Sequence, residues 1–553
     1  MTARTGTVPW PDDFAARYRE AGYWRGRPLG NWMWDWADRW GDRTAVVDGE
    51  RRLSYRELAE RADALADRLA GLGLRDGDNM LVQLPNCAEF LILFLACQRI
   101  GVAPLLALLP HREHELSFLA DLARVAAIAV PDTHSGYDHQ DLAAKLAAGV
   151  GRPCQVLVLG ADVRDGHADL RALTEPGPDP AATRRRLDRV APDPGSVALF
   201  LLSGGTTGLP KIIARTHDDY EYNARACAAA CGFGADTVYL VILPIAHNFP
   251  LGSPGALGAL RAGGRVVMAR SPNPEVAFPL VERERVTATS FVPAVGQRWS
   301  EEAAGSGYDL SSLRVVQLGG SVPPPGLPGR IAAALGCAVQ QVYGMAEGLI
   351  NYTRPDDPPD IAWHTQGRPV SPGDEVRLVD EHDCDVPAGE VGQLLTRGPY
   401  TPRGYFAAPE HNARAFTADG WYRSGDLVRW DTSGNLVVEG RVKDLINRGG
   451  EKISAPEIEA LVESLPQVRQ AAAVPVGDPE LGERIGLCVV LRPGTALTLA
   501  EVRAAVVASG AARFKAPERL AVLDTLPLTA VGKVDKKALR RYIESQEGVD
   551  VHG

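Results

Sequence analysis

The segment 203–211 combines glycine, hydroxyl and lysine side chains in the way that a phosphate-binding loop requires. It reads Ser-Gly-Gly-Thr-Thr-Gly-Leu-Pro-Lys and follows the apolar run 197–202. Glycine lets backbone N–H groups approach an anion closely, and the hydroxyls and the lysine add donors and positive charge. A flexible Gly/Thr hairpin is the alternative that this segment by itself leaves open. The predicted phosphate contacts are Ser203, Gly204, Gly205, Thr206, Thr207, Gly208 and Lys211.

This loop differs from a Walker A loop in its last residues. Leu-Pro separates the final glycine from the lysine, and no Ser or Thr follows the lysine to bind a metal ion. A P-loop nucleotide hydrolase is therefore not predicted.

Four later segments place charged or aromatic side chains in short motifs. They are 341–347 (Gln-Val-Tyr-Gly-Met-Ala-Glu), 422–426 (Tyr-Arg-Ser-Gly-Asp), 440–444 (Gly-Arg-Val-Lys-Asp) and 532–534 (Gly-Lys-Val). Alone, Glu347 or Asp426 would be interpreted as a solvated surface charge. Lys533 alone would be ambiguous because two further lysines lie nearby, but the flanking Leu-Thr and glycine residues single it out.

In this order and at these separations, the five segments resemble the adenylate-forming superfamily of acyl-CoA synthetases, luciferases and peptide-synthetase adenylation domains. The resemblance covers nearly the whole chain. It implies ATP and Mg²⁺ as cofactors and the attack of a carboxylate on the α-phosphorus of ATP, with pyrophosphate as the leaving group. Because two anions must meet, cationic and metal clamps should dominate catalysis.

The resemblance also implies how the nucleotide is held. Glu347 helps to bind Mg²⁺, and Tyr343 lies against the adenine ring. Asp426 accepts hydrogen bonds from the ribose hydroxyls, and Arg441 lies beside the ribose and the phosphate. The turn after Gly319 borders both the adenine and the acyl pocket, and its predicted contacts are Gly320 and Ser321.

Lys533 is the predicted catalytic lysine. By resemblance it bridges the carboxylate and the α-phosphate as the leaving charge develops, so its contact should raise kcat and not only affinity. One departure from the family is visible, because many members carry Thr one residue before the motif glutamate and this chain has Ala346. The aryl-acid branch of the family resembles this chain in having Met-Ala-Glu.

The acid is predicted from the segment 243–254, which reads Leu-Pro-Ile-Ala-His-Asn-Phe-Pro-Leu-Gly-Ser-Pro. Amino-acid-activating relatives carry an aspartate near Asn248 that pairs with the substrate ammonium. An amide cannot neutralise an ammonium, but it can hydrogen-bond a phenolic hydroxyl. The segment resembles 2,3-dihydroxybenzoate and salicylate AMP ligases, as do 348–354 and 446–452. Asn248 would read the ortho hydroxyl, His247 and Phe249 would shape the pocket, and His247 is also a catalytic candidate, with a packed core histidine as the alternative.

Two further positions are predicted to read the 3-position of the ring. In the resembling enzymes, Ser and Val at these two positions are found in ligases for 2,3-dihydroxybenzoate, and Cys and Leu are found in ligases for salicylate. This chain mixes the two patterns, with Ser253 and Ile350. One methylene of pocket volume discriminates by only about 1–3 kcal/mol, so both acids and ring-substituted salicylates remain open.

The polar, glycine-containing stretch 441–452 fits a hinge on which a small C-terminal domain could rotate. By resemblance Lys443 is the hinge residue and is needed for catalysis, and Gly449 and Gly450 would face a pantetheine tunnel. The implied acceptor is a phosphopantetheinylated aryl carrier protein supplied in trans, in siderophore or related nonribosomal peptide biosynthesis. An aryl-CoA ligase is the alternative enzyme. A catalytically silent adenylate-binding protein is disfavoured because all five charged motif residues are present (Lys211, Glu347, Asp426, Arg441 and Lys533).

Alternating helical and strand patterns predict an α/β fold with parallel pairing. We expect a large N-terminal domain, 1–442, with layered α/β sheets, a β-rich subdomain and both binding sites. A small mobile α+β domain, 443–553, would carry the catalytic lysine. Helices are expected near 54–72, where Ser54 to Glu57 form a capping box, near 88–98 and near 536–545. Strands are expected near 79–84, 156–159, 197–202, 427–430 and 436–438, with a turn at 431–434 between the last two. A surface connection is expected at 164–194.

Composition narrows the class of protein further. The net charge of −10 argues against nucleic-acid binding. The apolar stretch 90–109 is interrupted by Gln, Arg, Gly and Pro, so we interpret it as a buried helix leading into a strand and expect no membrane span. Without an apolar N-terminal leader, a cytoplasmic enzyme is expected. The eight scattered cysteines show no C-x-x-C pair and are expected to be reduced packing residues.

Overall fold

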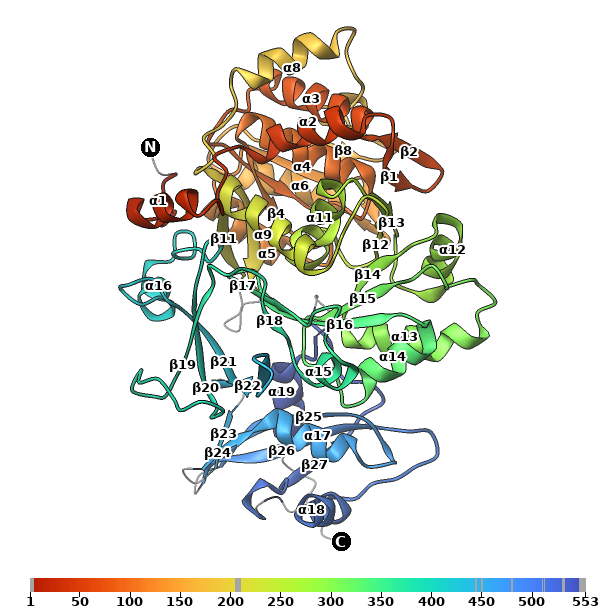
Figure 1. Ribbon diagram of the computed structural model, residues 1–553, viewed down its shortest axis with the longest axis vertical. Coiled ribbons are helices and arrows are strands. Elements are labelled where there is room, and N and C mark those ends of the chain that lie inside the picture. Colours follow the sequence, from red (N-terminus) through yellow and green to blue (C-terminus); the bar gives the residue numbers. More distant parts are fainter. Residues whose placement is uncertain are drawn as a thin grey trace.

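The computed structural model describes residues 4–203, 210–442, 445–448, 451–478, 481–509, 511, 513–529 and 533–546. Two large sheets with their helices form the upper and middle parts of the molecule in Figure 1, a smaller sheet lies to one side, and a compact C-terminal domain lies at the base. This mixed α/β architecture, with a large N-terminal and a small C-terminal domain, confirms the predicted fold class.

The first large sheet has seven strands in the order β11-β10-β4-β3-β5-β8-β9. All neighbours are parallel except the hairpin of β10 and β11. Its strands are β3 (Asn79–Val82), β4 (Ala103–Leu106), β5 (Ala127–Pro131), β8 (Gln155–Leu159), β9 (Ala168–Asp169), β10 (Val197–Ser203) and β11 (Lys211–Thr216). Its short runs of buried aliphatic residues are typical of strands covered on both faces.

The second large sheet has nine strands in the order β18-β17-β16-β15-β14-β12-β13-β1-β2. The central strands, from β16 to β1, are parallel, and antiparallel strands close both edges. Its strands are β1 (Thr44–Asp48), β2 (Arg51–Ser54), β12 (Val238–Val241), β13 (Arg265–Met268), β14 (Ala288–Phe291), β15 (Val315–Gly319), β16 (Ala338–Met345), β17 (Gly348–Tyr352) and β18 (Arg368–Pro369).

The helix α4 (Ala88–Ile100) packs against β4 of the first sheet and β1 of the second. All of its residues are buried, which explains the apolar composition that the sequence shows there. It leads directly into β4, as predicted for 90–109. Among the described residues, no helix is long and apolar enough to cross a membrane.

Helices cover the remaining faces of the two large sheets. At the start of α3, Ser54 and Glu57 form the predicted capping box, and each side chain bonds the other residue's backbone N–H. The helices are α1 (Asp12–Glu20), α2 (Leu29–Trp40), α3 (Tyr55–Gly71), α5 (Glu113–Leu122), α6 (His139–Gly149), α9 (His217–Ala230), α10 (Asn248–Gly252), α11 (Gly255–Arg261), α12 (Pro274–Glu284), α13 (Pro293–Glu302), α14 (Leu327–Leu335) and α15 (Pro359–His364).

The stretch 164–194 is more ordered than the expected surface connection. It contains β9, α7 (Leu170–Leu173) and α8 (Pro180–Asp188). Asp179 caps α8 and Pro180 opens it, so residues that suggested a loop instead start a helix. Asp188 then pairs at 2.8 Å with Arg99, whose side chain is fully buried, and this pair ties the helix to the core.

A four-stranded antiparallel sheet follows in the chain. It comprises β19 (Glu375–Val379), β20 (Gly392–Arg397), β21 (Tyr422–Trp430) and β22 (Leu436–Arg441), with α16 (Pro409–Ala415) between β20 and β21. The predicted strands around 427–430 and 436–438, with a turn between them, are β21 and β22. The sheet ends at Arg441, where the predicted hinge begins.

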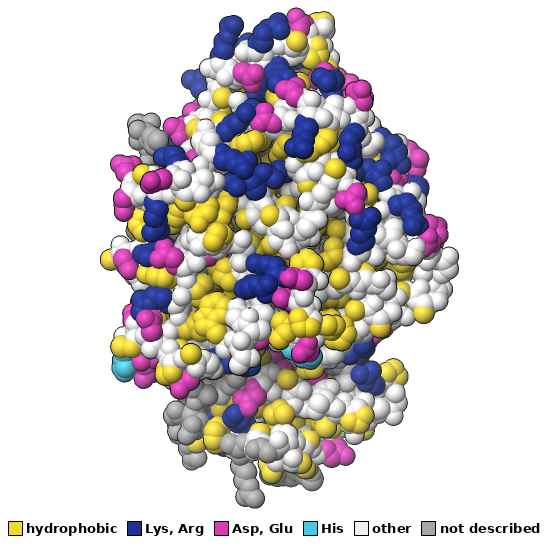
Figure 2. Space-filling view, in the orientation of Figure 1, with side chains coloured by type: hydrophobic (Ala, Val, Ile, Leu, Met, Phe, Trp, Pro, Cys, Tyr) yellow, Lys and Arg dark blue, Asp and Glu magenta, His cyan; other side chains and the backbone are white. Residues whose placement is uncertain are grey.

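The C-terminal part forms its own sheet and apolar core. Its elements are β23 (Leu445–Arg448), β24 (Glu451–Ser454), α17 (Ala455–Glu463), β25 (Val468–Asp478), β26 (Gly482–Leu491), α18 (Leu499–Ala508), β27 (Arg519–Val522) and α19 (Lys536–Ser545). The Ser454 hydroxyl donates to the Glu439 carbonyl at 2.9 Å, so β24 is held against β22. All eight cysteines are free, and five of them are buried, but Cys384 is exposed and is therefore not a packing residue. Figure 2 shows basic and acidic side chains interspersed over one face of the molecule.

Candidate active site

Three parallel strands of the nine-stranded sheet, β12, β15 and β16, end at the same edge and deliver several of the predicted residues. The loop after β12 leads to His247 and Asn248, the turn after β15 holds Gly320, and the turn after β16 holds Glu347. Loops beyond the carboxyl ends of parallel strands are the usual ligand sites of α/β sheets. Gly320 has φ +89°, a conformation that favours glycine, and Ser321 follows it on the exposed side of the turn.

Gly319 lies where the predicted acid-binding residues approach the strands that carry the predicted nucleotide-binding residues. A Cβ at this position would lie 2.8 Å from the Val342 carbonyl oxygen and 3.4 Å from the Phe249 ring. The absence of a side chain therefore lets α10 pack its aromatic residue directly against β15 and β16. Phe249 and Ile350 belong to the same apolar cluster.

Among the residues predicted to bind the nucleotide, the carboxylate of Asp426 joins two others. The Tyr343 hydroxyl donates to Asp426 Oδ2 at 2.6 Å, and Arg441 Nε donates to Asp426 Oδ1 at 2.5 Å. Asp426 is only 5% exposed, whereas the Arg441 side chain is 44% exposed and is able to reach a ligand. Burial and the nearby Asp426 charge hold the pKa of Tyr343 well above its usual range, so its hydroxyl stays a donor.

On the phosphate side, the hairpin of β10 and β11 places Ser203 directly opposite Lys211. The Lys211 ammonium lies 5.3 Å from the centre of the Tyr405 ring. The Tyr405 hydroxyl donates at 2.7 Å to Glu347 Oε1 and lies 3.1 Å from the Tyr422 hydroxyl. Burial lowers the pKa of Lys211, and the Glu347 charge opposes this shift.

The predicted acyl pocket is held by hydrogen bonds between buried groups. Asn248 Nδ2 donates to Ser253 Oγ at 3.3 Å, and the Tyr352 hydroxyl donates to the Ser253 carbonyl. Ile350 lies opposite Gly344 across β16 and β17, where a Cβ on Gly344 would lie 3.1 Å from Ile350 Cγ1. Asn248, Ser253 and Ile350 are all less than 9% exposed.

Lys533 comes from the C-terminal domain and lies between His247, a predicted acid-binding residue, and three residues predicted to bind the nucleotide or its metal ion, Arg441, Asp426 and Glu347. Protein atoms around the ammonium lower the pKa of Lys533, the Arg441 charge lowers it further, and Asp426 and Glu347 oppose both. Desolvation by surrounding protein atoms and the charge of Lys533 lower the pKa of His247 to about 4. Both residues keep solvent-accessible surface, so they line an open cleft and are not part of the core. His247 is also the N-cap of α10 and accepts from Phe249 N at 3.4 Å.

One carboxylate in this cleft suits a magnesium ion. Magnesium in nucleotide sites is usually held by one or two carboxylates together with substrate phosphates and water. Glu347 Oε1 is oriented by the Tyr405 hydroxyl, and Oε2 accepts no hydrogen bond from the residues that the structure describes. No cluster of three or more His, Cys, Asp or Glu residues that could hold a metal ion occurs in the described ranges, so phosphates would complete the coordination.

Several predicted residues lie outside the described part of the chain. They are Gly204, Gly205, Thr206, Thr207, Gly208, Lys443, Gly449 and Gly450.

Two site-wall residues were not identified from the sequence. Tyr405 orients Glu347 from 58 positions away, and Tyr220 reaches Asn248 from within α9. A single tyrosine carries no motif of its own, and only the fold shows which hydroxyl reaches a functional group.

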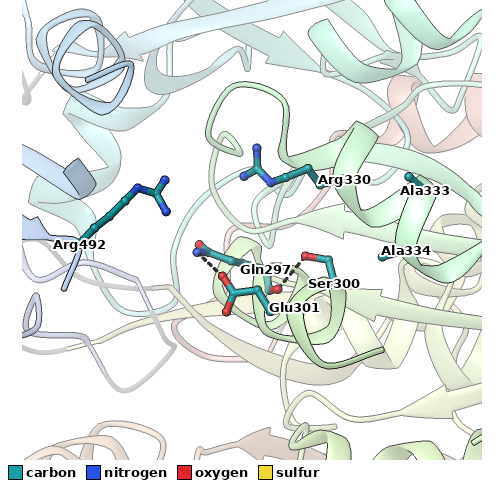
Figure 3. A pocket seen from close by; sticks show the side chains of 7 residues that line it. All are labelled: Gln297, Ser300, Glu301, Arg330, Ala333, Ala334 and Arg492. Carbon is teal, nitrogen blue, oxygen red and sulfur yellow. Dashed lines mark hydrogen bonds between the residues drawn. The ribbon is translucent and has the colours of Figure 1, made fainter. Parts of the chain in front are cut away.

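A separate groove of about 590 Å³ lies between the two domains. Arg330 of the large domain and Arg492 of the C-terminal domain point into it from opposite sides (Figure 3). Ser300 and Glu301 of α13 lie on its floor. The groove shares no residue with the cleft around Lys533.

The chain matches two family models. The AMP-binding enzyme model covers residues 33–406, and the AMP-binding enzyme C-terminal domain covers 457–533. It is 58% identical to a salicylyl-CoA synthase / salicylate adenylyltransferase from a Streptomyces species, over 98% of both chains. It is 46% identical to the salicyl-AMP ligase / salicyl-S-ArCP synthetase of Mycobacterium tuberculosis, over 97% of this chain and 94% of that protein.

A solved structure agrees in fold. The apo structure of Mycobacterium smegmatis MbtA superposes with a TM-score of 0.74, at 45% identity over 97% of this chain and 98% of that one. The chain therefore belongs to the AMP-binding enzyme family and is an adenylate-forming aryl acid ligase that uses ATP.

Proposed function

We propose that this enzyme activates a 2-hydroxybenzoate-type acid, salicylate or 2,3-dihydroxybenzoate, as its acyl-adenylate. It then passes the acyl group to the phosphopantetheine thiol of a separate aryl carrier protein. This reaction would supply the aryl group for siderophore or related nonribosomal peptide biosynthesis. We also propose that the enzyme acts in the cytoplasm.

The position of Lys533 is the observation that carries the first step. Its ammonium lies where the charges of Arg441, Asp426 and Glu347 act on it, and its own charge acts on His247. The first three residues mark the nucleotide side of the cleft, and His247 marks the acyl side. A cation at this place can stabilise charge on the carboxylate and the α-phosphate together.

In this first step a carboxylate oxygen of the acid attacks the α-phosphorus of ATP. A new oxygen–phosphorus bond forms, and the bond from the α-phosphorus to the bridging oxygen of the β-phosphate breaks. Lys533 stabilises the charge that develops between the reacting groups, and Lys211 and the 203–208 loop hold the departing pyrophosphate. When bound, Mg²⁺ beside Glu347 neutralises phosphate charge. Asp426 and Arg441 fix the ribose, with Tyr343 and the Gly320–Ser321 turn along the adenine.

The chemistry of Asn248 supports an ortho-hydroxylated acid. A neutral amide at the end of the pocket cannot pair with an ammonium, but it can bond a phenolic oxygen. Phe249 and Ile350 supply apolar walls for the ring, and Ser253 adds one hydroxyl near Asn248. The salicylate-directed names of the two relatives agree with this choice.

In the second step a thiolate attacks the acyl carbon, and AMP leaves. We propose that the C-terminal domain turns about Lys443 so that Lys533 withdraws and Gly449 and Gly450 line the pantetheine path. The relative named salicyl-S-ArCP synthetase supports a carrier protein as the acceptor. The relative named salicylyl-CoA synthase supports coenzyme A as the second candidate.

Thioester formation from salicylate and ATP distinguishes the two acceptors. A phosphopantetheinylated aryl carrier protein and coenzyme A are each supplied over a range of concentrations, and acylated product is quantified by mass spectrometry. A kcat/KM at least about tenfold higher for the carrier supports the proposal, since that ratio corresponds to about 1.4 kcal/mol. Equal or higher values for coenzyme A would assign the enzyme as an aryl-CoA ligase.

A further inference from the structure

We propose that Tyr220 is a positioning residue that sets the selectivity of the acyl pocket, because its hydroxyl fixes which end of the Asn248 amide faces the substrate. Tyr220 lies in α9 and is fully buried. Its hydroxyl donates at 3.0 Å to Asn248 Oδ1. This inference rests on the proposed function and deepens it by naming the chemical group that the pocket accepts at the ortho position.

The hydrogen bonds around Asn248 determine the amide orientation. The Tyr220 hydroxyl makes no other hydrogen bond within the described ranges, so its proton is directed to the Asn248 carbonyl oxygen. At the other end, Asn248 Nδ2 donates one hydrogen to Ser253 Oγ at 3.3 Å. A primary amide carries two N–H donors, so one N–H of Asn248 remains for a substrate.

The fold is built to let the Tyr220 hydroxyl reach this position. A Cβ on Gly252 would lie 2.7 Å from the hydroxyl oxygen, so a side chain there would displace it. Asn223, one turn further along α9, donates to the Gly252 carbonyl at 2.6 Å and holds α10 against α9. The guanidinium of Arg215 lies 5.1 Å from the centre of the Tyr220 ring and is itself paired with Asp219 at 2.7 Å.

The free N–H of Asn248 matches an ortho oxygen better than an ortho nitrogen. In a 2-hydroxybenzoate the phenolic proton bonds the neighbouring carboxylate, so the phenolic oxygen faces outward as an acceptor. In a 2-aminobenzoate one N–H bonds the carboxylate and the other faces outward as a donor. Two donors would then face each other, and a buried donor without an acceptor is costly. The pocket is therefore expected to take salicylate and to reject anthranilate.

Replacing Tyr220 by Phe tests the proposal. The variant Tyr220→Phe keeps the ring and removes the hydroxyl, so the amide is free to rotate and to offer its carbonyl oxygen to an amino group. Tyr239→Phe is the matched control, because Tyr239 is equally buried and its hydroxyl bonds Ser290 at 2.8 Å. The measurement is ATP–pyrophosphate exchange with salicylate, anthranilate and benzoate for the wild type and both variants.

We expect the ratio of kcat/KM for salicylate to that for anthranilate to fall by about tenfold in Tyr220→Phe, chiefly through the KM values, and to stay unchanged in Tyr239→Phe. Benzoate has no ortho group, so its kcat/KM should change little. A uniform loss for all three acids, or an unchanged ratio, would overturn the positioning role while leaving the proposed function intact. If the wild type failed to exchange with any ortho-hydroxylated acid, the proposed function would fall, and this inference with it.

Discussion

Arg441 and Asp426 are register partners on the antiparallel strands β22 and β21, and they form an ion pair of 2.5 Å at the edge of the cleft. The pair joins the last residue of the four-stranded sheet to the carboxylate that Tyr343 also contacts. A single hairpin thus positions the groups proposed to hold the ribose, immediately before the chain passes into the C-terminal domain.

Asp426→Asn should raise the KM for ATP and leave the KM for the acid nearly unchanged. Hydrogen bonds to charged groups contribute about 1.5–3 kcal/mol, so the expected rise is roughly 10- to 100-fold. Glu439→Gln is the control, because Glu439 pairs with Arg429 on the same two strands at a partly exposed position. The constants are measured by pyrophosphate exchange, and a larger rise for the acid than for ATP would refute the ribose assignment.

Lys533→Ala should reduce adenylation by about 100-fold or more, because a cation aimed at developing charge is lost. Transfer from a supplied aryl-adenylate to the carrier thiol should be largely retained, since Lys533 is proposed to withdraw for that step. Lys537→Ala, an exposed lysine at the start of α19, is the control. Equal losses in the two half-reactions would contradict the domain rotation.

Ile350→Val should raise the preference for 2,3-dihydroxybenzoate over salicylate. The change removes one methylene from the pocket wall and makes room for a 3-hydroxyl, with an expected shift of up to about tenfold. Ile331→Val, in the buried face of α14, controls for general loss of packing. The ratio of kcat/KM values for the two acids is the readout, and a ratio that both variants change equally would count against this map of the pocket.

Much of the fold could be predicted from residue patterns, because periodicity and capping act locally. The capping box at Ser54 and the apolar residues of α4 led to correct helices. The helix α8 was missed because Pro and Asp favour both loops and helix starts. The contact between Tyr220 and Asn248 could not be predicted, since it depends on how α9 packs on α10.

The ionisation of Asp374 should lower the free energy of unfolding as pH rises from about 4 to about 8. Its Oδ1 is buried without a hydrogen-bond partner among the described residues, and burial raises the pKa of Asp374 to about 8 despite the bond from the Tyr400 hydroxyl. Between the two values the unfolded chain releases this proton and the folded chain retains it. The free energy of unfolding therefore falls by up to about 1.4 kcal/mol per pH unit between these two pKa values. Above pH 8 this contribution no longer changes, because Asp374 is then ionised in both states.

The variant Asp374→Asn tests this effect, because it removes the ionisation and keeps an acceptor for Tyr400. Its free energy of unfolding in urea, compared with the wild type, should show an advantage that is absent near pH 4 and grows up to about pH 8. Asp524→Asn, at an exposed position, should show no such trend. Parallel stability curves for Asp374→Asn and wild type would contradict the assignment.

Asn248 is proposed to recognise the ortho hydroxyl of the aryl acid that the enzyme activates. The most direct measurement is kcat/KM for ATP–pyrophosphate exchange with salicylate and with benzoate, for the wild type and Asn248→Ala. We expect a preference for salicylate of at least about tenfold in the wild type, and we expect Asn248→Ala to lose it. Equal use of the two acids by the wild type, or a preference that survives in Asn248→Ala, would contradict it.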